Sequence, residues 1–225
     1  MKAIVFGGAG FLGSYVADAL SDAGHQVVIF DRTESAHLKL GQKMVIGDIT
    51  DQEAVEKAVK GCEVVYNFSA IADIDIAKER PVDVVKVNIL GNTYVLEAAR
   101  KANVKRFIFA SSVYVYSRFG AFYSDSKLAS EKIIESYQHQ FGLPFTILRY
   151  GSLYGPARSD HASSINKFIH QAIEKGKISY PGTGEEVREY IHVKDAAQLS
   201  IDILEPEFEN KHILITGHQM LKSRD

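Results

Sequence analysis

The stretch GGAGFLG, residues 7–13, directly follows the apolar run AIVF and places four glycines within seven residues. Glycine destabilises regular structure by roughly 0.5–1 kcal/mol relative to alanine, so this cluster indicates a backbone that side chains would obstruct. The glycines fit two spacings, Gly8-x-Gly10-x-x-Gly13 and Gly7-x-x-Gly10-x-x-Gly13. Between a strand and a helix, either spacing predicts a tight turn and a helix N-terminus that receives a pyrophosphate. A sharp turn without a ligand is the alternative interpretation.

Apolar runs of strand length alternate with helical patterns along the first 150 residues. The predicted strands are 2–6, 26–30, 43–47, 62–68, 105–111 and 144–150. The predicted helices are 11–23, 51–60, 81–104 and 123–141. Continuous Val/Ile/Phe runs between helices are typical of buried parallel strands, so the expected fold class is α/β, with a Rossmann-type doubly wound parallel sheet.

The alternation becomes looser after residue 150. The remaining predicted elements are a helix near 162–175, strands near 178–180, 187–192 and 212–216, a helix near 193–204, and a new helix starting at Ser223 as its N-cap. We therefore expect a cofactor-binding Rossmann domain over 1–150. A small, incomplete substrate-binding lobe over 151–225 is expected to be interleaved with the last elements of the sheet.

Composition argues against several other functions. A net charge of −2 over 225 residues provides no basic field to attract nucleic acid. Cys62 is the only cysteine, so no internal disulfide can form, and the eight histidines show neither HxH nor HExxH spacing, which argues against a metal site. The sequence has no signal-like N-terminus and no apolar run of 18 residues. We therefore expect a cytoplasmic protein with no membrane partner.

Asp31 ends the second predicted strand, 18 residues after Gly13. A carboxylate at this point of a dinucleotide-binding unit binds the ribose hydroxyls. The same carboxylate would repel a 2′-phosphate, which favours NAD over NADP. The neighbouring Arg32 leaves NADP as the alternative.

A second group of residues lies near the middle of the chain. In YSDSK, Tyr123 and Lys127 are four residues apart, so they share one face of a helix. Tyrosine is a poor base at neutral pH, but a nearby ammonium stabilises the phenolate and lowers its pKa. Ser111 and Ser112 end the preceding strand, at the sheet edge where open α/β folds bind ligands. These residues predict a catalytic Ser-Tyr-Lys group; a surface Tyr–Lys pair is the alternative.

Together these motifs resemble the extended short-chain dehydrogenase/reductase family, which includes the NAD-dependent nucleotide-sugar epimerases and dehydratases. The resemblance covers almost the whole chain. The matching segments are GGAGFLG (7–13), GDITD (47–51), NFSAIAD (67–73), VNILGNTYVLEAA (87–99), SSVYVYS (111–117), YSDSK (123–127), RYGSLYGP (149–156) and GTGEEVREYIHVKDAA (182–197).

The resemblance implies roles for individual residues. Ser112, Tyr123 and Lys127 would be catalytic, with Tyr123 exchanging a proton with a sugar hydroxyl. The residues implied to contact NAD are Gly7, Gly10, Phe11, Leu12, Gly13, Asp31, Arg32, Asp48, Ile49, Phe68, Ala70, Tyr123 and Lys127. Ser152 and Arg188 would bind the nucleotide-sugar substrate, Arg188 through its diphosphate. The helices near 81–104 and 123–141 would pair in a homodimer.

The chain also departs from the family pattern. Only 11 residues separate Ser112 from Tyr123, which shortens the loop that lines the sugar in similar proteins. The 4,6-dehydratases of this family carry an Asp-Glu pair directly after the catalytic Ser/Thr, and this chain has Val113 and Tyr114 there. Ser152 replaces the usual asparagine. Family members also normally continue for several tens of residues.

These departures favour one activity within the family and leave two alternatives. We expect a nucleotide-sugar epimerase similar to the UDP-sugar 4-epimerases, acting in polysaccharide synthesis, and disfavour 4,6-dehydration. A nucleotide-sugar dehydrogenase or decarboxylase shares every motif and is the first alternative. A non-catalytic NAD(P)-binding protein with a shortened substrate lobe is the second.

Overall fold

The computed structural model describes residues 1–158, 163–180 and 182–224. Its main sheet has seven parallel strands in the order β3-β2-β1-β4-β5-β6-β9. The strands are β1 (Lys2–Phe6), β2 (Gln26–Asp31), β3 (Lys43–Ile46), β4 (Val64–Asn67), β5 (Arg106–Ser112), β6 (Phe145–Tyr150) and β9 (Lys211–Ile215). The predicted α/β class with a Rossmann-type parallel sheet is confirmed. The strand order reverses between β1 and β4, and ligands of such sheets bind at this point.

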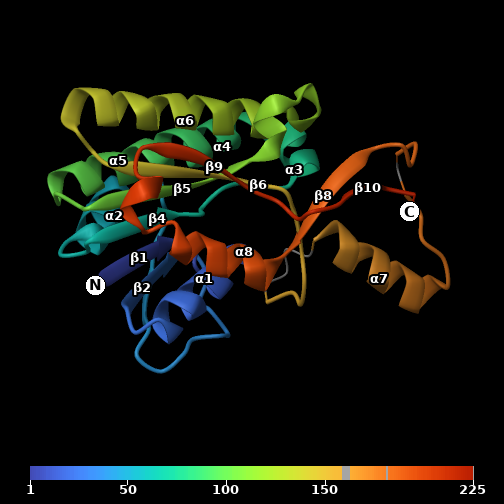
Figure 1. Ribbon diagram of the computed structural model, residues 1–225, viewed down its shortest axis with the longest axis horizontal. Helices are drawn as coiled ribbons and strands as arrows, with labels where there is room; N and C mark the ends of the chain where they lie inside the picture. The colour runs from blue at the N-terminus through green and yellow to red at the C-terminus, as the bar shows by residue number, and fades with distance from the viewer. Residues whose placement is uncertain (159–162, 181, 225) are drawn as a thin grey trace.

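A layer of helices covers each face of the main sheet (Figure 1). On one face, α1 (Phe11–Asp22) packs against α8 (Val193–Asp202). On the other face lie α2 (Gln52–Val59), α5 (Asn92–Lys101) and α6 (Ala121–Phe141). The sheet is therefore enclosed on both sides, as its continuous apolar strands require.

Two apolar clusters form the core, one on each side of the sheet. In β1, Ala3 and Val5 belong to the cluster under α1 and α8, whereas Ile4 and Phe6 belong to the cluster under α2, α5 and α6. All four side chains are fully buried. Because successive strand residues point to opposite faces, a strand covered on both faces must be apolar throughout.

The helix predicted over 81–104 is present, but its geometry changes along its length. Residues 81–101 form α4 (Pro81–Val84), the π-helical segment η1 (Val85–Gly91) and α5 in direct succession, and a separate helix, α3 (Ile74–Glu79), precedes them. Within η1, the Asn88 side chain accepts a hydrogen bond from the Ile71 N–H at 2.8 Å and donates one to the Ser126 hydroxyl at 2.9 Å. These contacts come from distant parts of the chain, so the apolar periodicity of the helix does not reveal them.

A small lobe extends from one end of the main sheet (Figure 1). Its three-stranded sheet has the order β10-β8-β7 and lies beside a single helix. The elements are β7 (Ser152–Tyr154), α7 (Ser164–Lys175), β8 (Val187–His192) and β10 (Met220–Lys222). A short 3₁₀ turn, η4 (Pro206–Phe208), connects α8 to β9.

One prediction for the small lobe is wrong. Residues 178–180 form no strand, because the sheet edge beside β8 is occupied by β10 instead. Ser223 follows β10, and its hydroxyl donates a hydrogen bond to the Glu186 carbonyl at 3.0 Å. The helix predicted to start at Ser223 would continue beyond the described residues and stays a prediction. Residue 162, at the start of the predicted helix 162–175, lies outside the described residues.

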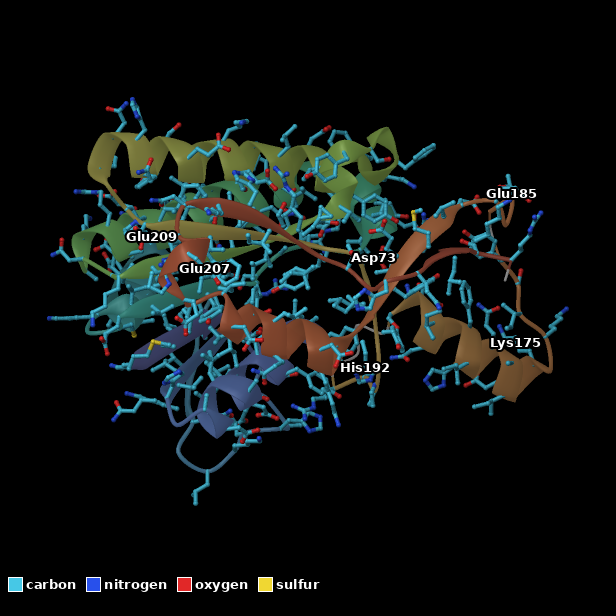
Figure 2. The ribbon with its side chains drawn as sticks, in the orientation of Figure 1. Asp73, Lys175, Glu185, His192, Glu207 and Glu209 are labelled. Atoms are coloured by element: carbon cyan, nitrogen blue, oxygen red, sulfur yellow. The ribbon has the colours of Figure 1, made fainter. Side chains whose placement is uncertain are left out.

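The chain passes between the two sheets three times. It leaves the main sheet at Gly151, where an added Cβ would lie 2.5 Å from the Glu189 carbonyl oxygen. It leaves again at Gly217, where an added Cβ would lie even closer to the Tyr190 carbonyl oxygen. It returns at His192, whose side chain accepts a hydrogen bond from the Lys194 N–H at 3.3 Å and caps α8 (Figure 2). Both glycines are required by these close backbone contacts.

The main sheet takes strands from both parts of the chain. β9 comes from the region after residue 150 and pairs with β6, as the expected interleaving requires. A domain boundary at residue 150 stays a prediction. Within the described residues, no helix combines the length and the apolar character needed to cross a membrane.

Candidate active site

The glycine loop connects β1 to α1 in the way that its spacing predicts. Gly7 has a φ of +73°, and an added Cβ would lie 2.7 Å from the Ser69 nitrogen. An added Cβ on Gly13 would overlap the Gly7 carbonyl oxygen, so this glycine allows helix and strand to pack together. Gly10 is the N-cap of α1 and provides no side-chain cap, which leaves the first N–H groups of the helix, from Phe11 and Leu12, for an anion.

Asp31 lies at the end of β2, beside the glycine loop. Its carboxylate accepts hydrogen bonds from the Ala9 N–H at 3.0 Å and from the Arg32 N–H at 2.7 Å. These bonds hold the carboxylate at the loop, where a ribose would lie in a bound dinucleotide. The Arg32 side chain is exposed to solvent.

The other residues implied to contact the cofactor lie on neighbouring strand ends. Asp48 accepts hydrogen bonds from the backbone and hydroxyl of Thr50; burial raises the pKa of its carboxyl, but these bonds outweigh burial and lower the pKa overall. Ile49 is 5% exposed and belongs to the core. Phe68 and Ala70 are half-buried and follow β4, and the Phe68 backbone lies next to Gly7.

The structure brings Ser112, Tyr123 and Lys127 to the same edge of the sheet. Ser112 is the last residue of β5, and Tyr123 and Lys127 lie in the first turns of α6. The Lys127 side chain is almost fully buried, and its Nζ donates a hydrogen bond of 2.6 Å to the Ala110 carbonyl. The same nitrogen lies 5.8 Å from the centroid of the Tyr123 ring.

Burial has the largest effect on the pKa values of Tyr123 and Lys127. Burial raises the pKa of the Tyr123 phenol to about 12, although a hydrogen bond with Ser112 acts in the opposite direction. Burial lowers the pKa of the Lys127 ammonium to about 7, against the effect of the Glu131 carboxylate. In this structure the loss of hydration has the larger effect on the Tyr123 pKa, and the Lys127 Nζ is hydrogen-bonded to the Ala110 carbonyl. The stabilisation of the Tyr123 phenolate by Lys127 stays a prediction.

Sequence reasoning missed a buried carboxylate next to this group. Glu131 is fully buried on α6, four residues after Lys127, and accepts a hydrogen bond of 2.5 Å from the Ser111 hydroxyl. Arg149 on β6 donates two further hydrogen bonds to the same carboxylate, at 3.0 and 2.6 Å. The spacing Lys127-x-x-x-Glu131 places both residues on one helix face and was the available signal.

The candidate substrate residues belong to the small lobe. Ser152 lies on β7 in register with Tyr190 of β8. Arg188 reaches back toward the main domain: its Cζ atom lies 5.9 Å from the ring centroid of Tyr114. Tyr114 belongs to η2 (Val113–Tyr116), the turn directly after Ser112, and a second turn, η3 (Arg118–Gly120), leads into α6.

A hollow of about 610 Å³ lies within the small lobe, and Tyr123 does not line it. Its lining includes Phe168 of α7, Tyr190 and His192 of β8, and Leu221 of β10. Among the described residues, no cluster of His, Cys, Asp or Glu side chains could hold a metal ion.

Comparison with known proteins identifies the family. The model of the NAD-dependent epimerase/dehydratase family matches residues 3–216. The chain belongs to this family. The glycine loop, the uncapped N-terminus of α1 and the fixed Asp31 carboxylate fit NAD, the cofactor of the NAD-dependent epimerase/dehydratase family.

Relatives within the NAD-dependent epimerase/dehydratase family carry different activities in their names. A UDP-N-acetyl-alpha-D-glucosaminuronate decarboxylase of Bacillus cytotoxicus is 29% identical, over 99% of this chain and 76% of its own. A human dTDP-D-glucose 4,6-dehydratase is 26% identical, over 90% of this chain and 65% of its own. The structure of the Thermus thermophilus UDP-glucose 4-epimerase in complex with NAD is 27% identical, with a TM-score of 0.87, and the match covers 100% of this chain and 80% of that one.

Proposed function

We propose that the protein is an NAD-dependent nucleotide-sugar epimerase, similar to the UDP-sugar 4-epimerases. The observation that carries this proposal is the meeting of Ser112, Tyr123 and Lys127 at the sheet edge that also presents the glycine loop. The named epimerase among the relatives supports it. Arg188, with its guanidinium turned toward the turn after Ser112, is the residue proposed to bind the diphosphate.

Tyr123, Ser112 and Lys127 have separate roles in the proposed reaction. Tyr123 exchanges a proton between its Oη atom and the sugar hydroxyl, and Ser112 holds that hydroxyl in place by a hydrogen bond. Lys127, when protonated, stabilises the Tyr123 phenolate. NAD supplies the hydride acceptor when it is bound. General acid–base catalysis of this kind contributes about 10²- to 10⁴-fold to the rate.

The residues after Ser112 distinguish epimerisation from 4,6-dehydration. Elimination of water needs an acid and a base beside the sugar. Val113 and Tyr114 occupy the two positions where similar dehydratases carry Asp and Glu, and neither side chain carries a carboxylate. The missing carboxylates favour an activity that needs only the Ser-Tyr-Lys group.

A dehydrogenase or decarboxylase is the second candidate, because one relative is named as a decarboxylase and shares the whole length of this chain. A non-catalytic NAD-binding protein is the third. Epimerisation returns the hydride to the sugar, whereas oxidation leaves NADH in solution. The accumulation of NADH therefore marks a dehydrogenase, and a sugar product that has lost CO₂ marks a decarboxylase.

We also propose a homodimer. Val82, Val85, Leu90 and Leu128, on the helices expected to pair, are between 42% and 64% exposed. Burying such side chains between two copies would stabilise the dimer. Analytical ultracentrifugation of the wild type and of Leu128→Glu tests the dimer; a wild-type monomer would contradict it.

We propose that the protein acts in the cytoplasm. We propose no nucleic-acid partner and no membrane partner for it.

The function is tested by incubating the protein with NAD and a panel of UDP-, GDP-, ADP-, CDP- and dTDP-sugars. Absorbance at the nicotinamide band follows NADH, and chromatography identifies the sugars. A new epimer without NADH supports the epimerase. Accumulated NADH supports a dehydrogenase, and a product that has lost CO₂ supports a decarboxylase. No turnover with any sugar, with NAD bound, supports the third candidate.

A further inference from the structure

Tyr114 lies between the two ends of the candidate active site. Its ring is 6.5 Å from the Tyr123 ring, centroid to centroid, with the planes at 75°. The Cζ atom of Arg188 lies 5.9 Å from the same Tyr114 ring. These are the distances of an edge-to-face aromatic pair and of a cation–π contact. One side chain thus touches both the residue proposed to react and the residue proposed to bind the diphosphate.

The backbone of Tyr114 is held firmly in this position. Its N–H donates to the Ser112 Oγ at 3.2 Å, and its carbonyl accepts from the Ser124 hydroxyl at 2.7 Å and from the Ser117 N–H at 2.9 Å. Gly120 packs against it, and a Cβ there would lie 3.2 Å from the Tyr114 Cβ. The backbone and Cβ of Tyr114 are therefore held in place before a substrate arrives, which lowers the entropic cost of binding against its side chain.

The shape of a nucleotide sugar determines what must lie against this ring. The sugar is bonded directly to the diphosphate, so the reacting carbon and the phosphates are separated only by the sugar itself. A substrate that presents its diphosphate to Arg188 and its hydroxyl to Tyr123 must place the sugar ring between them. The Tyr114 ring lies near both of these residues, so a sugar held between them would lie against it.

We propose that Tyr114 is a specificity-determining residue that packs against the sugar ring of the nucleotide-sugar substrate. The proposal rests on the proposed function, and it assigns a contact to a position that the acid–base chemistry does not use. The aromatic ring offers an apolar surface to the C–H groups of a pyranose, and the phenol offers one hydrogen bond. Tyr114 therefore contributes affinity for the sugar in addition to any effect that it has, through Arg188, on the diphosphate that UDP and the nucleotide sugar share.

The test compares the binding of UDP-glucose with the binding of UDP, by calorimetry on the protein saturated with NAD. The measured quantity is the dissociation constant of UDP-glucose divided by that of UDP, so a higher ratio means a weaker contribution of the sugar to binding. Tyr114→Ala should raise this ratio about tenfold, the effect of losing one aromatic contact. Tyr114→Phe keeps the ring and should leave the ratio within about twofold of the wild type. If wild type binds dTDP-glucose or GDP-mannose instead, dTDP or GDP replaces UDP.

Phe119 provides the matched control, because it belongs to the same loop and is 86% exposed. Phe119→Ala should leave the ratio unchanged. An unchanged ratio in Tyr114→Ala, with wild type binding a nucleotide sugar, would overturn the role of Tyr114 and leave the proposed function standing. If the ratio rises equally in Tyr114→Phe and Tyr114→Ala, the effect comes from the lost hydroxyl, and the proposed packing of the ring against the sugar is refuted. If wild type binds NAD but no nucleotide sugar, the proposed function fails, and the role of Tyr114 fails with it.

Discussion

The ammonium of Lys127 donates a hydrogen bond of 2.6 Å to the carbonyl of Ala110, the residue that precedes Ser111 and Ser112 in β5. This bond ties the first turns of α6 to the end of the central sheet. It places the candidate catalytic lysine in a site with almost no solvent exposure. The cost of burying its charge makes Lys127 a source of instability as well as a candidate for catalysis.

Replacing Lys127 by Met should raise the melting temperature at pH 7 by about 4 °C, and this gain should shrink as the pH rises. The pKa of Lys127 is lowered by burial to about 7 in the folded protein, from 10.5 in the unfolded chain. Below pH 7 the folded protein carries the full cost of the buried charge. Between the two values the unfolded state binds more protons, so wild-type stability rises with pH.

Thermal unfolding of the wild type and of Lys127→Met, followed by circular dichroism from pH 7 to pH 10, checks this. Lys132→Met is a control, because Lys132 is exposed on the same helix. A difference between wild type and Lys127→Met that is constant over this pH range would contradict the prediction.

Replacing Gly13 by Ala should abolish NAD binding and destabilise the fold. The added Cβ would overlap the Gly7 carbonyl oxygen, so α1 would have to move away from β1 and from the phosphate site. Overpacking of this kind costs about 1–3 kcal/mol. Calorimetric titration with NAD and urea denaturation measure both effects.

Gly24→Ala is the control for the glycine loop. Nothing lies within 4 Å of a Cβ added at Gly24, and its φ is +80°. The substitution should therefore lose only about 1 kcal/mol of stability to the left-handed backbone and keep full NAD affinity. Undiminished NAD affinity in Gly13→Ala would refute the role given to the close approach of helix and strand.

Replacing Tyr123 by Phe should lower the rate of sugar conversion about 10²- to 10⁴-fold while NAD affinity stays within a few-fold of wild type. The change removes the hydroxyl that exchanges the proton and keeps the ring beside Tyr114. Tyr94→Phe, on α5, is the control. A Tyr123→Phe protein with wild-type turnover would exclude the proposed chemistry.

Replacing Glu131 by Gln should destabilise the protein by about 3–5 kcal/mol, because it leaves the Arg149 guanidinium without its charged partner. The double variant Glu131→Gln/Arg149→Met should recover part of this loss. Urea denaturation of the single and double variants measures the coupling. Lys132→Gln breaks an exposed ion pair with Glu135 and should cost less than about 1 kcal/mol. Equal losses in Lys132→Gln and Glu131→Gln would contradict the importance of burial.

The local features of the fold could be predicted because they depend on neighbouring residues. The strand–loop–helix unit around Gly7 and Gly13 follows from short-range sterics. The π-helical segment within the helix over 81–104 could not be predicted, because the hydrogen bonds of Asn88 with Ile71 and Ser126 that accompany it join distant parts of the chain.

In the candidate active site, too, the local contacts could be predicted and the long-range contacts could not. Tyr123 and Lys127 share one helix turn, and their proximity follows from their spacing. The pairing of Glu131 with Arg149 joins residues 18 positions apart, and the contact of Tyr114 with Arg188 joins two lobes. The pKa shifts of Tyr123 and Lys127 depend on burial, which sequence spacing does not measure.

The three passages of the chain between the sheets have a mechanical consequence. A lobe joined by a single strand can swing, and one joined by two can rotate about the line between them. Passages at Gly151, His192 and Gly217 remove that remaining axis. The ion pair of Lys167 on α7 with Asp73 before α3, 3.3 Å long, adds a fourth connection. We therefore expect the small lobe to act as a fixed wall, and Arg188 to keep its distance from Tyr123 when a sugar lies between them.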